Sequence, residues 1–198
     1  YKYIIFRGDF LKKKTVVITG AGSGLGREAA IELAKRGHSV IATTMYEKQA
    51  QEINTLANDR RIDLKSFKLD INLENDRNKL KELDFDVLIN NAAIGDSGSI
   101  ADISVDRIEN VFETNVFSNI KITQVALKNM IENKRGRVIF LSSLAGRISI
   151  PFLGPYCASK FAIEGFASSL RKEMKKLDDV NIQIGIIAVS YTHLRAHE

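Results

Sequence analysis

The sequence predicts an α/β fold in which a doubly wound parallel sheet is covered by helices on both faces. Two observations lead to this prediction. From Lys12 onward, short apolar or β-branched runs alternate with segments of helical apolar spacing, and this alternation is typical of parallel sheets. The first run, residues 15–18, has no polar break and leads into a glycine-rich turn. Such a run indicates a strand buried on both faces, and right-handed crossovers then give the doubly wound arrangement.

The elements follow one another without repeats, low-complexity tracts or a linker, so a single domain is expected. A chain of 198 residues is long enough to bury a sizeable core. Gly37 is a usual stop for the first helix. Expected strands cover residues 15–19, 39–43, 65–69, 87–90, 137–141 and 181–187, and expected helices cover 25–36, 47–58, 73–83, 105–133 (one helix or two abutting ones) and 156–177.

Composition and charge indicate a protein of the cytoplasm. The net charge of +5 is spread along the chain, and its one cluster, residues 12–14, is expected to be a solvated strand flank and not a nucleic-acid patch. Cys157 is the only cysteine, so no internal disulfide is expected, and we expect it to be a small core residue. No secretory signal and no apolar run near the roughly 20 residues of a membrane span are seen. His38 follows the helix stop and is expected to be exposed.

The beginning of the chain does not continue the domain pattern. The first residue is Tyr1, and residues 1–11 are expected to be a leader outside the domain. Two interpretations remain open. Residues 7–9 could be encoded by a purine-rich ribosome-binding run, with Leu11 as an alternative start codon, or the leader is an ordinary N-terminal segment.

The end of the chain is expected to be an artefact. The segment VSYTHLRAHE resembles the in-frame translation of a transposase adapter used in sequencing libraries. Residues 188–198 are therefore expected to be a non-native tail, and the domain to cover residues 12–187. His193 and His197 in this tail have a spacing that could imitate a metal site, and we expect no metal there.

The glycine-rich turn after the first strand is typical of phosphate binding. Gly20, Gly22, Gly24 and Gly26 lead into an amphipathic helix. Glycine lets the backbone approach a bound group closely, and free N–H groups with the positive helix end attract a phosphate. Because the pattern lies between a buried strand and a helix, it predicts a dinucleotide-binding turn.

Several motifs follow at matching places along the chain. The glycines have the spacing TGxxxGxG, Asn90-Asn91-Ala92-Ala93 ends the fourth strand, and Asn115 lies in the long helix. Ser142-Ser143 ends the fifth strand, and Tyr156-Cys157-Ala158-Ser159-Lys160 opens the next helix as YxxxK. With these motifs, residues 13–187 resemble the short-chain dehydrogenase/reductase family, which implies a Rossmann-type fold.

The resemblance implies a catalytic group around Tyr156. Tyr156 and Lys160 are four residues apart and share one helix face. A free tyrosine has a pKa of about 10, and a nearby ammonium group favours the phenolate of such a side chain. By resemblance, Tyr156 exchanges a proton with the substrate oxygen while a hydride moves to or from the cofactor, Ser143 hydrogen-bonds that oxygen, and Asn115 holds a water that relays protons to Lys160. Asn115 as a helix-bend residue is the alternative, and Ser142 is expected to be structural.

The resemblance also implies a nicotinamide cofactor, with NADP favoured and NAD left open. Thr44 stands where NAD-dependent relatives have an acidic residue, and Ser23 stands where NADP enzymes often have Arg or Lys. Asn91 either ties the fourth and fifth strands together or contacts the cofactor, and Asp70 with Ile71 is expected on the adenine side. The implied cofactor-binding residues are Gly20, Ser23, Gly24, Leu25, Gly26, Thr44, Asp70, Ile71, Asn91, Tyr156 and Lys160.

The implied function is a cytoplasmic NAD(P)-dependent oxidoreductase that interconverts an alcohol and a carbonyl. The segment YCASKFAIEGF is similar to the hydroxysteroid- and retinol-type branch of the family. A non-catalytic NADP-binding regulator and an epimerase or dehydratase relative are the alternatives. The family implies a homodimer or homotetramer assembled through the long helices. It also implies a last strand and a substrate lid that residues 12–187 lack, so the chain as given is expected to be inactive and its substrate is not identified.

Overall fold

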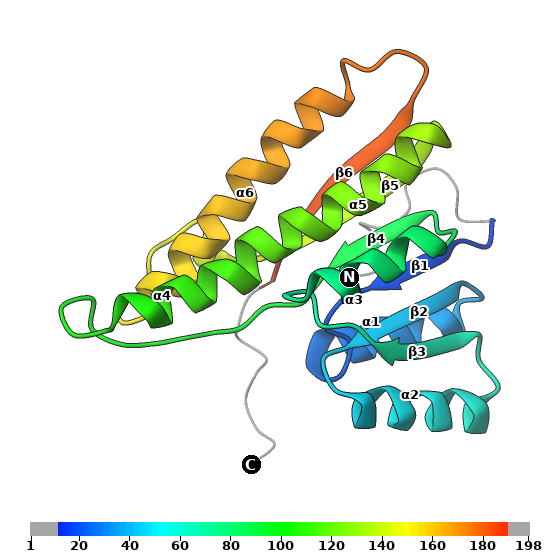
Figure 1. Cartoon of the computed structure of the whole chain (residues 1–198), viewed down its shortest axis with the longest axis horizontal. Helices are drawn as coiled ribbons and strands as arrows, with labels where there is room; N and C mark the ends of the chain where they lie inside the picture. The colour runs from blue at the N-terminus through cyan, green and yellow to red at the C-terminus, as the bar shows by residue number, and fades with distance from the viewer. Residues whose placement is uncertain (1–11, 190–198) are drawn as a thin grey trace.

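A six-stranded, fully parallel sheet forms the centre of the molecule (Figure 1). The computed structural model describes residues 12–189. The strand order is β3-β2-β1-β4-β5-β6, which confirms the doubly wound arrangement. The strands are β1 (Thr15–Ile18), β2 (Ser39–Thr44), β3 (Leu64–Lys68), β4 (Val87–Asn90), β5 (Arg135–Ser143) and β6 (Asn181–Val189).

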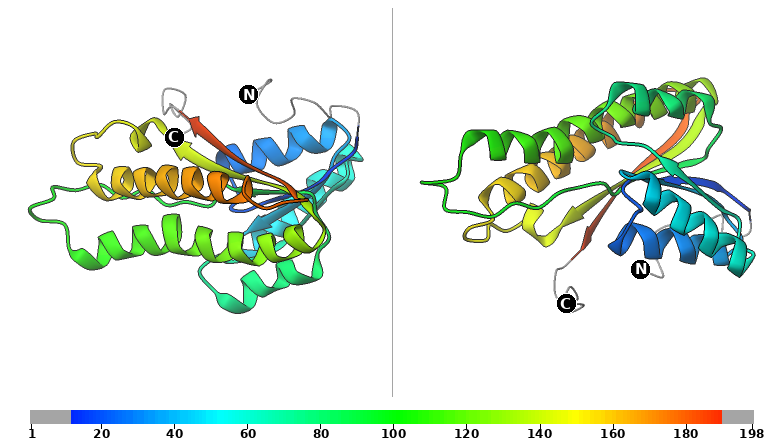
Figure 2. Two further views of the ribbon diagram at one scale, coloured as in Figure 1. Left: turned by 90° about the horizontal axis from the view of Figure 1, so that it is seen from above. Right: turned by 60° about the horizontal axis from the view of Figure 1, so that its bottom comes forward.

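Helices cover both faces of the sheet. Figure 2 shows α1 on one face and α5 with α6 on the other. The helices are α1 (Gly24–Lys35), α2 (Glu47–Arg60), α3 (Glu74–Asn78), α4 (Val105–Phe112), α5 (Asn119–Glu132) and α6 (Gly154–Met174). Two 3-10 turns, η1 (Lys79–Glu82) and η3 (Leu144–Gly146), and a π-helical segment, η2 (Glu113–Ser118), complete them.

The two faces of the sheet carry two separate hydrophobic cores. Val16 and Ile18 pack with apolar residues of α1 and α2, whereas Val17 packs with apolar residues of α5 and α6. All three side chains are at most 1% exposed. Successive side chains of a strand point to opposite faces, so a strand buried on both sides needs an unbroken apolar run. This is why the run in β1 predicts a central strand.

The long expected helix over residues 105–133 is interrupted. The segment α4 passes into η2, a π-helical segment, before α5 begins. The expected helix over residues 73–83 is α3 followed by the 3-10 turn η1. An amphipathic pattern indicates which face of a helix is buried, but a change of hydrogen-bond register leaves the same apolar spacing nearly unchanged.

The end of β6 lies two residues beyond the expected end of the domain. Ala188 and Val189 pair with Ser142 and Ser143 of β5, so these two residues of the expected artefactual tail continue the strand. The expected leader, residues 1–11, and the rest of the expected tail, with His193 and His197, lie outside the described residues.

The expectation that His38 is exposed is wrong. Its side chain is 8% exposed, and its Nδ1 accepts a hydrogen bond from the backbone N–H of Lys14 at 3.3 Å. The turn after α1 folds back against the chain that enters β1, which the local sequence does not reveal. Burial, with Arg36 and Lys14 nearby, lowers the pKa of His38.

Cys157 is buried, as expected. Within residues 12–189 there is no helix of the length and hydropathy that a membrane crossing requires.

The strand order reverses between β1 and β4, and two turns meet there at close range. Gly20, after β1, has φ 63°, and a Cβ on it would lie 2.6 Å from the Cα of Ala92, after β4. Gly24 has a similar φ of 55°, but a Cβ there would meet nothing within 4 Å. Gly20 is therefore required both for its conformation and for the approach of a neighbouring backbone, and Gly24 for its conformation alone.

Alanine substitution at Gly20 and at Gly24 should separate the cost of the positive φ from the cost of the close approach of Ala92. Gly24→Ala should lower the free energy of unfolding by about 1–2 kcal/mol, the cost of a left-handed conformation. Gly20→Ala should cost roughly 1–3 kcal/mol more, because its methyl group meets backbone atoms that must move. Urea denaturation of both variants measures the difference. Equal losses would show that the approach of Ala92 puts no constraint on Gly20.

Candidate active site

A cavity of about 1010 Å³ lies at the carboxyl edge of the sheet. It is at the upper end of the roughly 300–1,000 Å³ of typical ligand sites, and residues that follow β1, β2, β3 and β4 line it together with parts of β5, β6 and α6. In open α/β sheets, ligands bind in this place, where the strand order reverses. Ten of the eleven expected cofactor-binding residues line the cavity, namely Gly20, Ser23, Gly24, Leu25, Gly26, Asp70, Ile71, Asn91, Tyr156 and Lys160.

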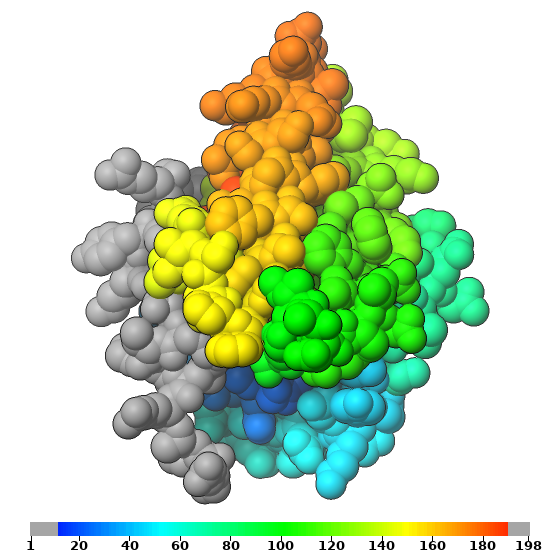
Figure 3. Space-filling model, turned by 90° about the vertical axis from the view of Figure 1, so that its left-hand side faces the viewer, coloured from blue at the N-terminus to red at the C-terminus, as the bar shows by residue number. Residues whose placement is uncertain are grey.

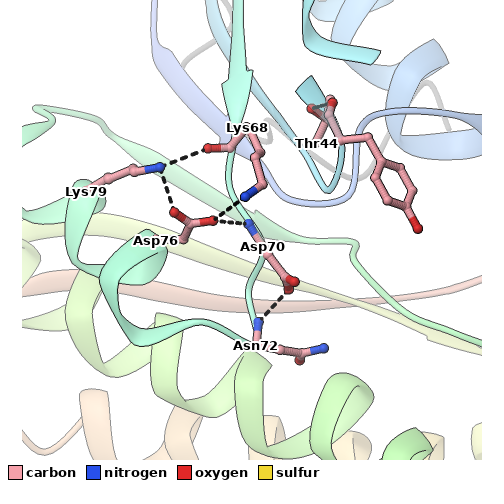
Figure 4. Close-up of polar contacts among 7 residues, drawn as sticks. Thr44, Lys68, Asp70, Asn72, Asp76 and Lys79 are labelled. Carbon is pink, nitrogen blue, oxygen red and sulfur yellow. Dashed lines mark hydrogen bonds and ion pairs between the residues drawn. The ribbon is translucent and has the colours of Figure 1, made fainter. Parts of the chain in front are cut away.

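The eleventh residue, Thr44, lies below the cavity surface. It is fully buried, and its Oγ1 donates a hydrogen bond to the backbone oxygen of Tyr46 at 2.9 Å (Figure 4). Met45, Tyr46 and Gln49 line the cavity at this end of β2 instead. Sequence reasoning missed these three neutral residues, although their place just after the second strand, in the turn and at the start of α2, could have indicated them.

Asn91 fixes the glycine turn from the end of β4. Its Nδ2 donates to the backbone oxygens of Thr19 and Gly20 at 2.8 and 3.0 Å. A Cβ at Gly26 would collide with the same amide. Asn91 therefore ties β4 to the turn after β1, and not to β5, while it also lines the cavity. The glycine at position 26 lets α1 approach this amide.

The beginning of α1 is arranged to receive an anion. The Ser23 side chain makes no capping hydrogen bond, and Ser23, Gly24 and Leu25 line the cavity. The first N–H groups of a helix have no partner within the helix, and the helix dipole makes this end positive. Phosphate groups fit such a position.

Lys160 and Tyr156 are placed together by α6. This helix begins at Gly154 with Pro155 in its first turn, a position that proline favours. Tyr156 is 8% and Lys160 5% exposed. The Lys160 Nζ donates to the backbone oxygen of Leu141 at 2.9 Å and lies 5.6 Å from the centre of the Tyr156 ring. Burial lowers the pKa of Lys160 to about 8, which leaves the ammonium form predominant at neutral pH.

The two serines at the end of β5 occupy different positions. Ser143 is 2% exposed, and its Oγ accepts a hydrogen bond from the backbone N–H of Ala145 at 3.2 Å, which caps η3. Ser142 contributes to the cavity lining, and its buried Oγ has no hydrogen-bond partner among the described residues. Ser143 is not among the residues that line the cavity.

Asn115 lies in the π-helical segment η2 and joins two parts of the site. Its Oδ1 accepts from the backbone N–H of Ile94 at 2.8 Å, and its Nδ2 donates to the Ile94 oxygen at 2.8 Å and to Ser159 Oγ at 3.0 Å. The side chain thus fastens the segment after β4 to α6, one residue before Lys160. It is 1% exposed and does not line the cavity. π-helical turns occur frequently at functional sites.

Two segments lie together beside the start of α6, and of their residues only Ile94 lines the cavity. Residues 94–104 and 144–153 lie against each other in Figure 3, where the first is green and the second yellow. The backbone N–H of Gly98 donates to the Phe152 oxygen at 2.8 Å.

Among the described residues, no group of three or more His, Cys, Asp or Glu side chains could hold a metal ion.

Comparison with known proteins places the chain in a family. The family model described as short chain dehydrogenase matches residues 14–197. The chain is 38% identical over 192 residues to dehydrogenase/reductase SDR family member 7B of Xenopus laevis, with 88% of this chain aligned. It is 29% identical over 176 residues to human 17-beta-hydroxysteroid dehydrogenase 13, with 85% aligned. The chain spans 58% of the length of each of these two relatives.

The fold is shared with solved structures. A single-site variant of actinorhodin polyketide ketoreductase with NADPH superposes with a TM-score of 0.83 at 25% identity, over 89% of this chain and 69% of that one. Among similar solved structures, some are complexes with NADP and others with NAD. The family model covers nearly the whole chain, so the chain belongs to the short-chain dehydrogenase family.

Proposed function

We propose that this protein is an NAD(P)-dependent oxidoreductase that interconverts an alcohol and a carbonyl compound. The observation that carries the proposal is the placement of Tyr156 and the buried Lys160 in the same cavity as the glycine turn. A phosphate-binding turn alone would fit many nucleotide-binding proteins. A tyrosine beside a buried ammonium group adds an acid/base group at the other end of that cavity.

The cavity fits a dinucleotide cofactor. The turn around Ser23 and Gly24 would hold the pyrophosphate, Asp70 and Ile71 the adenosine half, and Tyr156 with Lys160 the nicotinamide half. When bound, the nicotinamide ring supplies or accepts the hydride. A non-catalytic regulator would be expected to have lost Tyr156 or Lys160, and both are present.

The residues of this chain have distinct parts in the proposed reaction. The Tyr156 hydroxyl passes a proton to the carbonyl oxygen in reduction and takes one from the alcohol in oxidation. Ser143 adjoins Ser142, which lines the cavity, and its Oγ accepts from Ala145, so its hydroxyl hydrogen is left to donate to the same substrate oxygen once the substrate reaches the end of β5. The Lys160 ammonium keeps positive charge beside Tyr156, and Asn115 holds α6 and the Ile94 segment in register.

We propose NADP as the favoured cofactor. The residues that line the cavity after β2 are Met45, Tyr46 and Gln49, none of which carries a negative charge. A carboxylate at this place would repel a 2′-phosphate, so its absence favours NADP. The polyketide ketoreductase that shares the fold carries NADPH.

The proposal extends to substrate branch, location and assembly. The segment that opens α6 supports a hydroxysteroid- or retinol-type branch, and the 17-beta-hydroxysteroid dehydrogenase similarity agrees with it. We propose a cytoplasmic location, as the single cysteine suggests.

Phe117 of η2 and Phe161 of α6 are 49% and 44% exposed, which supports a homodimer or homotetramer formed through these helices.

Tyr156→Phe tests the acid/base role. Removal of the hydroxyl should lower kcat by about 10²–10⁴-fold, the usual contribution of a positioned acid or base. The assay follows nicotinamide absorbance with a panel of aldehydes, ketones and secondary alcohols, using protein from the complete gene. Cofactor affinity, measured by fluorescence titration, should change little, because the ring remains. Wild-type turnover in the variant would contradict the proposal.

Lys160→Met tests the cost of the buried charge. The pKa of Lys160 is about 8 in the folded protein and 10.5 unperturbed. Below about pH 8 Lys160 is protonated in both the folded and the unfolded state, so the folded protein carries the full free-energy cost of burying the ammonium group. Between about pH 8 and 10.5 the unfolded state binds more protons, so wild-type stability rises with pH. The variant should therefore be more stable than wild type at pH 7, by up to roughly 3 kcal/mol, and this advantage should shrink toward pH 10.5.

Urea denaturation of Lys160→Met and wild type across this pH range measures the effect. Lys172→Met, at an exposed lysine of the same helix, is the matched control and should show no such trend. A constant stability difference between Lys160→Met and wild type from pH 7 to 10.5 would mean that Lys160 is not held in a charge-disfavouring environment.

Steady-state kinetics with NADPH and NADH test the cofactor preference. The neutral lining after β2 offers no carboxylate to accept the ribose hydroxyls of NADH and none to repel the 2′-phosphate of NADPH, so kcat/KM should be higher for NADPH than for NADH. Both cofactors are compared at one fixed concentration of the same carbonyl substrate. A preference for NADH would refute the NADP assignment and leave the proposed reaction intact.

A further inference from the structure

Two charged residues of the short helix α3 are buried. Asp76 is 7% and Arg77 8% exposed, while Glu74 of the same helix is exposed. Burial of a charge is costly unless hydrogen bonds compensate it. Each side chain makes a hydrogen bond with a backbone group of the turn that joins β3 to α3.

The carboxylate of Asp76 holds the start of this turn. Its Oδ2 accepts a hydrogen bond from the backbone N–H of Asp70 at 2.8 Å (Figure 4). Its Oδ1 accepts from Lys79 Nζ at 2.6 Å, and Lys68 Nζ lies 3.9 Å from Oδ2. Burial raises the pKa of Asp76, but hydrogen bonds from Lys79 and the Asp70 backbone outweigh it, so the pKa is lowered. The group is therefore a carboxylate at neutral pH.

Two further hydrogen bonds, from Arg77 and Lys79, fix the backbone of the same turn. Arg77 Nη1 donates to the backbone oxygen of Ile71 at 2.7 Å. Lys79 Nζ, which binds Asp76, also donates to the backbone oxygen of Lys68 at 3.2 Å. Side chains from α3 and η1 thus hold backbone groups of residues 68, 70 and 71. Hydrogen bonds with a charged partner are roughly twice as strong as neutral ones.

The turn that is held in this way lines the β3 end of the cavity. Leu69, Asp70, Ile71 and Asn72 face the cavity, whereas Asp76 and Arg77 do not. Tyr156 lies at the opposite end, on α6 beyond β1 and β4 in the sheet order. If the nicotinamide half lies beside Tyr156, the adenosine half lies at β3.

We propose that Asp76 and Arg77 are positioning residues for the adenosine half of the dinucleotide. They touch the backbone of the turn and not the nucleotide, and they fix where Asp70 and Ile71 meet it. The inference rests on the proposed function, because that function assigns the two halves of the cofactor. It adds a specific consequence. Loss of the hydrogen bonds from Asp76 or Arg77 to the turn should weaken binding of the adenosine half and leave binding of the nicotinamide half unchanged.

The test uses the two halves of the cofactor as separate probes. Isothermal titration calorimetry gives Kd for 5′-AMP, for reduced nicotinamide mononucleotide and for NADPH in wild type, Asp76→Ala and Arg77→Met. We expect Kd for 5′-AMP and NADPH to rise about tenfold in each variant, as for loss of one charge-assisted hydrogen bond. Kd for the mononucleotide should stay within about twofold, because that probe does not reach β3.

Two further variants control for a general loss of structure. Asp76→Asn keeps an oxygen that can accept from Asp70, so it should recover most of the 5′-AMP affinity. Glu74→Gln removes an exposed carboxylate from the same helix and should bind all three probes like wild type. Should Asp76→Ala not fold, Arg77→Met tests the same claim at a different backbone group.

The outcomes separate this inference from the proposed function. Wild-type affinity for 5′-AMP in folded Asp76→Ala and Arg77→Met would overturn the positioning role and leave the oxidoreductase proposal in place. Equal weakening of both half-probes would also overturn it, since it would indicate a general loosening of the site. Failure of wild type to bind 5′-AMP, NADPH and NADH would overturn both.

Discussion

The buried ammonium group of Lys160 is the constraint on which the site depends. A positive charge at a 5% exposed position is unfavourable, and it contacts the Leu141 backbone oxygen and the Tyr156 ring. Both contacts require the end of β5 and the first turns of α6 to lie close together. Gly146 permits this, because a Cβ there would come within 2.8 Å of Ser142 Oγ and 3.1 Å of the Lys160 oxygen. The fold retains a charge that weakens it, as functional sites often do.

Buried polar side chains hold the loops at the carboxyl edge of the sheet. Asn91 binds the backbone of the glycine turn, Asn115 binds the Ile94 backbone and Ser159, and Asp76 binds the Asp70 backbone. In each case a side chain from one element satisfies a main-chain group of a loop that follows another strand. Such loops have no strand or helix ladder to fix them. A site held within a fraction of an ångström needs this second layer of contacts.

The elements and motifs that depend on local sequence were predictable. The unbroken run of β1, the glycine spacing after it and the four-residue spacing of Tyr156 and Lys160 each carry their signal within a few residues. These signals predict the central strand of the sheet, the turn that follows it and the placement of Tyr156 and Lys160 on one face of α6. The meeting of these parts in one cavity followed from the rule that parallel strands end at one edge.

The features that depend on tertiary packing were not predictable in the same way. Thr44 is buried where β2 pairs with β3, and His38 accepts from the backbone N–H of Lys14 because β1 lies beside β2. Asp76 and Arg77 look like solvated charges in a polar helix, and their burial follows only from the turn they hold. The π-helical segment around Asn115 likewise makes its contacts with Ile94 and Ser159, which are distant in the sequence.

A crystal structure of the protein with NADP bound tests the central claim most directly. The account predicts the pyrophosphate on the turn from Gly20 to Gly26, the adenosine beside Asp70 and Ile71, and the nicotinamide ring within reach of the Tyr156 hydroxyl. A cofactor bound with its nicotinamide at the β3 end, or a Tyr156 hydroxyl directed away from both the ring and Ser143, would contradict it.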